Sequence, residues 1–352
     1  MLIKNDLYLS ELDIINNARN DWEKIDGHSF LIIGATGMIG SYMIDVLMQR
    51  NSTMRSNIQI YAMSRSLDKM KKRFASYLST PFFNLVEGDI KEPINLSENV
   101  DYVLQGASNT HPRAYSTDPI GTIMTNLKGT ENVLNYAVKN KNTRVMFLST
   151  VEIYGENRGD VEKFDENYCG YIDCNTLRAG YPEGKRVSES LCQAYIEKYN
   201  VDVVIPRLCR TFGPTMLLND SKASSQFIMN GVRKENIVLK SKGDQYFSYA
   251  YVGDVVYALL FLLSSGKTGE AYNIAVEEFN LRLKELARII AAQNKIQIIF
   301  DFPDAEEQKG YSKANMAILD PNKLKELGWY NLFSLNESID HTVRIIRNET
   351  YN

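Results

Sequence analysis

The chain has 352 residues, of which 44% are hydrophobic and 24% charged, and its formal net charge is −3 at pH 7. These values are typical of a soluble globular protein built as one large α/β unit or two lobes. They exclude a strongly basic surface, so we expect no nucleic acid and no membrane as partner. The sequence has no long apolar run and no leader-like segment, which predicts a cytoplasmic protein.

The cysteines and histidines do not form a metal-ligand pattern. Cys169 and Cys174 lack the second Cys pair or His pair that a zinc site needs, and the three His residues are scattered. We therefore expect no bound metal, and free thiols at Cys169, Cys174, Cys192 and Cys209.

Residues 1–29 precede the first strand-like apolar run. Their apolar positions fit an amphipathic helix, and we expect this N-terminal helical extension to pack against the rest of the chain. A partner-binding arm is the alternative interpretation.

From residue 30 onward, apolar runs typical of strands alternate with segments of helical spacing. The predicted strands are residues 30–33, 58–62, 83–86, 102–104, 145–148 and 203–206, and the predicted helices include residues 121–139 and 181–199. This alternation predicts an α/β fold, a Rossmann-like doubly wound parallel sheet with helices on both faces. Ligands of such sheets bind at the carboxyl ends of the strands, where the strand order reverses.

A glycine-rich turn, residues 34–40 (GATGMIG), follows the first predicted strand and opens a helical pattern. Backbone N–H groups and a helix N-terminus are then placed to receive a pyrophosphate. A tight turn without a ligand is the alternative for so short a motif. The predicted dinucleotide contacts in this turn are Gly34, Thr36, Gly37, Met38, Ile39 and Gly40.

A second motif places Tyr181 and Lys185 four residues apart on one helix face. A cation beside a tyrosine favours the phenolate, which would make Tyr181 an acid or base near neutral pH. The spacing alone is weak evidence, because the chain has 21 Tyr.

The order of these motifs resembles an extended short-chain dehydrogenase/reductase of the NAD-dependent epimerase/dehydratase family: glycine turn, Ser149-Thr150 at a strand end, then Tyr181 with Lys185. The resemblance extends over residues 30–347. Residues 178–186 (RAGYPEGKR) are most similar to the UDP-glucuronate decarboxylase-like branch. Other markers are residues 88–90, Asn126 with 129–130, 149–155, 212–214, 251–254, 272–274 and 327–329.

The resemblance implies a domain organisation and partners. It implies an NAD(P)-binding Rossmann domain over residues 30–207, to which the chain returns near 250–275. A smaller C-terminal α/β lobe, residues 208–352, would bind a nucleotide-activated sugar. Related enzymes pair through two helices, here 118–139 and 181–199, so we expect a homodimer joined by a four-helix bundle.

The resemblance also implies residue roles. Tyr181 would pass a proton to or from a sugar oxygen while hydride moves between the nicotinamide and the adjacent carbon. Lys185 would lower the pKa of Tyr181 and bind the nicotinamide ribose, and Thr150 would hydrogen-bond the sugar oxygen. Further expected dinucleotide contacts are Asp89, Ile90, Gly106, Ala107, Ser108, Asn126, Ser149 and Pro206, and further expected substrate contacts are Asn109 and Thr110.

The end of the second predicted strand departs from the family. NAD-dependent members carry an acid there, which pairs with the ribose hydroxyls and repels a 2′-phosphate. This chain has Ser64, Arg65 and Ser66, whose guanidinium and hydroxyls suit a phosphate. We therefore expect NADP(H) to be preferred over NAD(H), with stacking of Arg65 on adenine as the alternative.

Two further departures concern the substrate. Dehydratases have an Asp-Glu pair where this chain has Val151 and Glu152. Valine cannot protonate a leaving hydroxyl, so dehydration is disfavoured, while Glu152 remains to contact substrate or water. Phe247 replaces the arginine that clamps the substrate diphosphate, and Arg210 occupies an asparagine position. Arg210 would take over the clamp; an internal ion pair of Arg210 is the alternative.

These departures favour an NADP(H)-dependent reductase acting on a carbonyl of a nucleotide-activated sugar, in the synthesis of bacterial surface polysaccharide precursors. The first alternative is a UDP-glucuronate decarboxylase-like or other epimerase/dehydratase that recycles its NAD. A non-enzymatic dinucleotide sensor is the second, and an intact Tyr181 and Lys185 argue against it.

Overall fold

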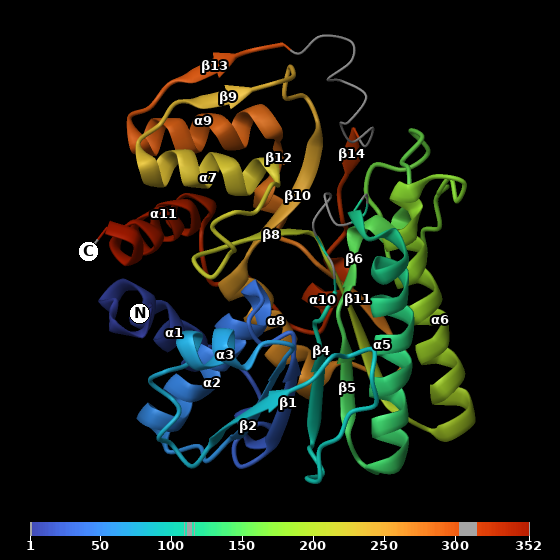
Figure 1. The fold of residues 1–352 in the computed structure, drawn as a ribbon. Helices are drawn as coiled ribbons and strands as arrows, with labels where there is room; N and C mark the ends of the chain where they lie inside the picture. The colour runs from blue at the N-terminus through green and yellow to red at the C-terminus, as the bar shows by residue number, and fades with distance from the viewer. Residues whose placement is uncertain (1, 109, 111–114, 116, 303–314, 352) are drawn as a thin grey trace.

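The computed structural model describes residues 2–108, 110, 115, 117–302 and 315–351. Its main element is an eight-stranded sheet in the order β11-β7-β5-β4-β1-β2-β3, with β6 also paired to β7 (Figure 1). All strand pairs described for this sheet are parallel. Its strands are β1 (Ser29–Ile33), β2 (Gln59–Ser64), β3 (Phe83–Glu87), β4 (Tyr102–Gln105), β5 (Arg144–Phe147), β6 (Ser149–Thr150), β7 (Asp202–Leu208) and β11 (Ala271–Ile274).

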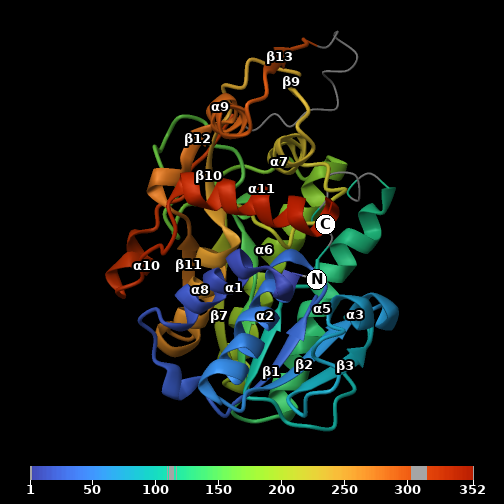
Figure 2. The ribbon, with the colours of Figure 1, turned by 90° about the vertical axis from the view of Figure 1, so that its left-hand side faces the viewer.

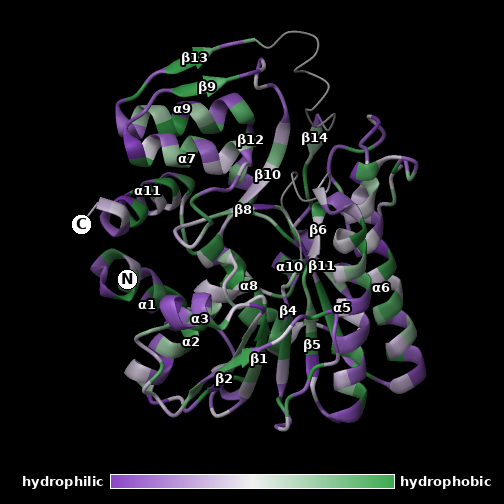
Figure 3. Cartoon of the chain, viewed as in Figure 1, coloured by the Kyte–Doolittle hydropathy of each residue, from purple (hydrophilic) through white to green (hydrophobic). Residues whose placement is uncertain are grey.

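The strands form because parallel strands covered on both faces need nearly continuous apolar runs. Residues 30–33 of β1 and all four residues of β4 are buried. In Figure 3 these central strands carry the hydrophobic colour, while the helices around them are mixed. The predicted Rossmann-like fold is therefore confirmed.

The chain winds outward from the middle of the sheet in both directions. It passes from β1 to β2 and β3, and then returns to β4 on the other side of β1. The reversal of strand order thus lies between β1 and β4, so the loops that follow these two strands border the expected ligand position.

Helices lie on either side of the large sheet. α5 (Pro119–Lys139) and α6 (Gly180–Tyr199) lie side by side on the right in Figure 1, and α2 (Met38–Met54) and α8 (Val252–Ser265) lie on the left. The shorter α3 (Leu67–Arg73) follows β2.

A second group of elements lies above the large sheet in Figure 1. It contains a four-stranded sheet, in which β10 pairs with β8, β12 and β14, and the separate pair β9–β13. Its strands are β8 (Arg210–Phe212), β9 (Ile237–Leu239), β10 (Tyr246–Tyr251), β12 (Asn280–Arg282), β13 (Ile298–Phe300) and β14 (Met316–Ala317). Its helices are α7 (Ala223–Arg233), α9 (Leu283–Asn294) and α11 (Leu335–Tyr351), and α10 (Asn322–Glu326) lies beside β11.

The N-terminal helix α1 (Asp6–Asn16) packs against α2, α8 and α11 (Figure 2). Its Glu11 is fully buried and accepts hydrogen bonds from the Tyr251 hydroxyl, at 2.7 and 2.6 Å, and from Tyr42. The Nδ1 atom of His341 on α11 lies 2.8 Å from the same carboxylate. A buried carboxylate is stable only with such partners, so this segment is integrated into the core. Within the described ranges, no helix combines the length and the apolar character needed to cross a bilayer.

Candidate active site

The glycine turn connects β1 to α2, and two of its glycines lie where the backbone leaves no room for a side chain. Gly34 has φ +83°, and a Cβ there would meet the backbone of Gly106 and Ala107 at 3.0 Å. A Cβ at Gly40 would lie 2.6 Å from the Gly34 carbonyl oxygen. Gly37 is the N-cap of α2, so the free N–H groups of Met38 and Ile39 begin the helix beside the β4 loop. This cradle fits a dinucleotide pyrophosphate.

The end of β2 lies next to this turn. The Ser64 hydroxyl is 3.3 Å from that of Thr36, and the Ser66 hydroxyl accepts a hydrogen bond from Lys69 N as the N-cap of α3. Arg65 is exposed. Sequence reasoning missed Glu87 at the end of β3: it pairs in register with Ser64 and accepts a hydrogen bond from Leu67 N. A carboxylate therefore lies near the position where β2 itself lacks one.

The loop after β4 is supported by α5. Ser108 donates a hydrogen bond to Asn126 Oδ1 at 2.8 Å, and the fully buried Asn126 donates one to the Thr122 carbonyl. The amide of Ala107 donates to the Gln105 side chain, and Gly106 N donates to the Ile33 carbonyl. This brings the expected residues 106–108 to the glycine turn.

The other expected contacts around this loop are less closely placed. Ile90 is buried against Gly129, and Asp89 caps its own loop by accepting from Lys91 N. Thr110 is exposed, and Asn109 lies outside the described residues. Pro206 is buried in β7, one residue before the partner of Ser149 in the sheet register.

Helix α6 carries Tyr181 and Lys185, both almost fully buried. Lys185 Nζ donates a hydrogen bond to the Leu148 carbonyl at 2.6 Å and lies 4.6 Å from the centre of the Phe147 ring. Desolvation lowers the pKa of Lys185 to about 8, although the Glu189 carboxylate acts in the opposite direction. The ammonium is thus held at the strand end that leads to Ser149 and Thr150.

The pKa of Tyr181 corrects one sequence expectation. We expected Lys185 to favour the phenolate, but the pKa of Tyr181 lies above its ordinary value, because burial dominates and the Glu152 carboxylate adds to it. A hydrogen bond with Thr150 and the charge of Arg178 lower the pKa, but by less. In this structure the phenol is therefore protonated at neutral pH.

Tyr115 and Arg178, to which the sequence analysis gave no role, complete the surroundings of Tyr181. The rings of Tyr115 and Tyr181 stack with centres 5.1 Å apart and planes 19° from parallel. The Arg178 guanidinium lies 4.7 Å from the Tyr115 ring and forms a two-pronged ion pair with Glu152, at 2.8 Å for both N–O pairs. Glu152 lies two residues after Thr150, and the Thr150 hydroxyl accepts a hydrogen bond from Glu152 N. Thr150, Glu152 and Tyr181 are therefore one cluster.

A second ion pair behind this cluster joins α6 to the strand ends. Arg207 donates to both carboxylate oxygens of Glu189, at 3.1 and 2.7 Å, and Ser149 donates to Glu189 at 2.5 Å. Arg207 also donates to the Tyr154 hydroxyl at 3.0 Å. Glu189 could have been found from the sequence, because it lies four residues after Lys185 and therefore on the same face of the helix.

Arg210 and Phe247 meet because β8 and β10 are paired, with Arg210 opposite Tyr249. The Arg210 Cζ atom lies 3.4 Å from the centre of the Phe247 ring. Its Nη1 atom is buried and has no hydrogen-bond partner among the described residues. The alternative of an internal ion pair for Arg210 has no support within this part of the chain.

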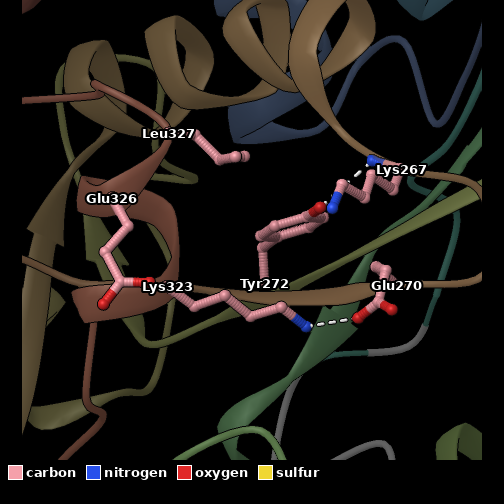
Figure 4. A pocket seen from close by; sticks show the side chains of 6 residues that line it. All are labelled: Lys267, Glu270, Tyr272, Lys323, Glu326 and Leu327. Carbon is pink, nitrogen blue, oxygen red and sulfur yellow. Dashed lines mark hydrogen bonds and ion pairs between the residues drawn. The ribbon is translucent and has the colours of Figure 1, made fainter.

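A cavity of about 230 Å³ lies elsewhere, between the edge strand β11 and α10 (Figure 4). Lys323 and Glu270 form an ion pair in it, at 2.5 Å, and Lys267 N donates to the Tyr272 hydroxyl. None of its lining residues belongs to the Tyr181 cluster or to the glycine turn. We therefore do not place the chemistry there. The described residues also contain no group of three or more His, Cys, Asp or Glu that could hold a metal ion.

The chain has clear relatives in sequence. The sequence model of the NAD dependent epimerase/dehydratase family matches residues 30–275. UDP-glucuronic acid decarboxylase 6 of Arabidopsis thaliana is 31% identical over 312 residues, which cover 88% of this chain and 86% of that protein. UDP-glucuronic acid decarboxylase 1 of Xenopus tropicalis is 28% identical over 329 residues, which cover 92% and 73%.

Solved structures share the fold at lower identity. The dTDP-glucose 4,6-dehydratase of Bacillus anthracis, in complex with NAD, superposes with a TM-score of 0.76 at 18% identity and covers 92% of this chain and 97% of its own. The UDP-glucuronic acid 4-epimerase of Bacillus cereus, in complex with UDP-glucuronic acid and NAD, gives a TM-score of 0.77 at 17% identity, with 91% and 99% covered.

The lowered pKa of Lys185 predicts a pH-dependent stability. Burying Lys185 in its charged form lowers the free energy of unfolding. This loss is complete below pH 8, where the folded protein keeps the proton, and it disappears above the ordinary pKa of 10.5. Between about pH 7 and pH 9.5, wild type should gain about 2 kcal/mol of unfolding free energy relative to Lys185→Met, in urea titrations without cofactor. The exposed Lys139→Met is the matched control. A difference between wild type and Lys185→Met that stays constant with pH would contradict the assignment.

Proposed function

Because this chain belongs to the NAD dependent epimerase/dehydratase family, we propose that it transfers hydride between a nicotinamide dinucleotide and one carbon of a nucleotide-activated sugar. The resemblance in sequence, including its UDP-glucuronate decarboxylase branch, is confirmed by the relatives. One observation carries the proposal: Thr150, Tyr181 and Lys185 converge at a strand end, where Leu148 lies beside Gly106 of the loop that packs on Gly34. A bound nicotinamide would supply or accept the hydride.

We favour net reduction as the direction. The Tyr181 phenol is protonated at neutral pH and hydrogen-bonds with Thr150, so it is placed to give its proton to a substrate oxygen. Reduction of a carbonyl needs such a donor. The carbonyl carbon would receive the hydride, and the carbonyl oxygen would receive the proton of Tyr181 while it is hydrogen-bonded to the Thr150 hydroxyl. The finer proposal is an NADP(H)-dependent reductase for bacterial surface polysaccharide precursors. The exposed Arg65 at the end of β2, where the strand has no acid, supports a 2′-phosphate.

A decarboxylase-like reaction is the second candidate, and the Glu152–Arg178 pair favours it. Both residues lie beside Tyr181, and the relatives at 28–31% identity are UDP-glucuronic acid decarboxylases. In this reaction the dinucleotide would be recycled within each turnover. A panel of nucleotide sugars with NADPH or NADH separates the two: reduction consumes the cofactor stoichiometrically, whereas decarboxylation releases CO₂ without net consumption.

The first prediction of the proposal concerns the proton carrier. Tyr181→Phe should lower turnover on the substrate found in that panel by roughly 10²- to 10⁴-fold, because only the transferable proton is lost. Dinucleotide affinity, measured by fluorescence titration, should stay close to wild type. The matched control is Tyr195→Phe on the same helix, whose hydroxyl binds Asn135 instead. Substantial turnover by Tyr181→Phe would mean that this phenol is not the proton carrier.

The second prediction concerns cofactor choice. Arg65→Ala should weaken NADPH binding by one charge-assisted contact, about 1.5–3 kcal/mol, and leave NADH binding nearly unchanged. Glu87→Gln removes the neighbouring carboxylate and should not weaken NADPH binding, since less negative charge then faces the 2′-phosphate. Calorimetric titration measures both. Equal losses for both cofactors in Arg65→Ala would rule out the 2′-phosphate contact.

The third prediction concerns assembly. We propose a homodimer through α5 and α6, because apolar side chains are exposed on these helices: Ile120, Ile123 and Met124 on α5 and Val187 on α6. Light scattering at micromolar concentration should give the mass of two chains, and the double change Ile120→Glu with Met124→Glu should give one, because the added charges would be buried in the interface. A monomeric wild type would contradict the proposal.

A further inference from the structure

Arg210 is a charged side chain that forms no ion pair with any residue that the structure describes. Its guanidinium stacks on Phe247, 3.4 Å from the ring centre, and Phe247 is itself buried. Its Nη1 is buried without a partner among the described residues. Desolvation lowers the pKa of Arg210, and the smaller opposing effects of Tyr249 and Glu152 do not compensate for it.

Other arginines in the protein interior differ in this respect. Arg50 also stacks on an aromatic ring, with Cζ 3.8 Å from Trp22, but it binds both carboxylate oxygens of Asp26. Arg73 pairs with Asp45 in the same way as Arg207 pairs with Glu189. Buried charges in proteins are normally paired, because an isolated one is costly. Arg210 is half-buried and its Nη1 atom is fully buried, so the lack of a carboxylate partner among the described residues calls for an explanation.

The surroundings of Arg210 place it near the reacting end of the site. Arg210 lies two residues after Leu208, which pairs in register with Thr150. Glu152 raises the pKa of Arg210 and Arg178 lowers it, so both charges of the pair beside Tyr181 act on this guanidinium. Glu152 is already bound by two nitrogens of Arg178. Tyr249, which lies opposite Arg210 in the sheet, also raises the pKa of Arg210. Burial raises the pKa of Tyr249 itself to about 12, so its phenol is uncharged at neutral pH and is no counter-charge. Within the described part of the chain, no carboxylate thus forms an ion pair with Arg210.

We propose that Arg210, oriented by Phe247, is the receptor for an oxyanion of the bound substrate, either its diphosphate or a carboxylate on its sugar. The inference rests on the proposed function, because it names what the substrate must carry. A planar guanidinium binds a phosphate or a carboxylate through two parallel hydrogen bonds, and stacking on an aromatic ring limits its rotation. The oxyanion would supply the counter-charge that Arg210 does not find among the described residues.

The experiment compares wild type with Arg210→Met, which keeps an apolar chain to pack on Phe247. Binding of UDP, UDP-glucose and UDP-glucuronate to the cofactor-loaded protein is measured by calorimetry. We expect a loss of roughly 10- to 150-fold in affinity, the value of one charge-assisted contact. An equal loss for all three ligands identifies the diphosphate as the bound group, and a loss confined to UDP-glucuronate identifies the sugar carboxylate.

Stability without ligand gives the second readout. Arg210→Met removes a half-buried guanidinium that has no ion-pair partner among the described residues, so its melting temperature should equal or exceed that of wild type. The matched control Arg50→Met breaks the ion pair with Asp26 and should lower the melting temperature without changing ligand affinity. If Arg210→Met lowers stability and leaves all three affinities unchanged, Arg210 is a structural residue and the inference is wrong.

Failure of the inference can be told apart from failure of the proposed function. If Arg210-dependent binding occurs but no nucleotide sugar is oxidised, reduced or decarboxylated, the receptor stands and the reaction is wrong. If turnover occurs and Arg210→Met has wild-type affinity and KM, the reaction stands and the receptor is overturned.

Discussion

The ion pair between Glu189 and Arg207 is the interaction on which the arrangement of the site depends. Tyr181 and Lys185 lie on a helix, whereas Thr150 lies at a strand end, and a shift between the two would separate the phenol from the hydroxyl. Glu189 joins them, because it belongs to α6 and binds both Arg207 on β7 and Ser149 on β6. Both side chains of the pair are only 12% exposed. Loss of one partner would leave a largely buried charge, which typically costs about 3–5 kcal/mol.

Burial gives the two central side chains their electrostatic character. Desolvation disfavours the charged form of any group, so it lowers the pKa of Lys185 and raises that of Tyr181. The two shifts have opposite signs, but both favour the neutral species. At neutral pH the Tyr181 phenol is uncharged and Lys185 is still largely protonated, while Arg178 and Arg207 are paired with Glu152 and Glu189. The Tyr181 phenol therefore keeps its proton at neutral pH until a substrate oxygen accepts it during the reaction.

The smaller sheet positions the proposed substrate contact. The pairing of β8 with β10 places the Arg210 guanidinium over the Phe247 ring. The same strand β10 ends at Tyr251, whose hydroxyl binds Glu11 of the N-terminal helix, and Glu11 also contacts His341 of α11. Helices α1 and α11 therefore hold the last residue of β10 in place. The first residues of the same strand include Phe247, which contacts Arg210.

The sequence by itself determined the family, the parallel sheet and the glycine turn. These features follow from local rules: apolar runs for buried strands, glycines where a backbone passes at 2.6–3.0 Å, and a four-residue spacing for one helix face. Strands β1 to β5 and β7 begin or end within two residues of the predicted limits for the same reason. Only the tertiary structure decided the protonation of Tyr181, since burial outweighs a neighbouring cation and cannot be computed from spacing. It also decided the partners of Glu152, Glu189 and Arg210, because Arg178, Arg207 and Phe247 reach them only through strand pairing and loop paths that no local pattern encodes.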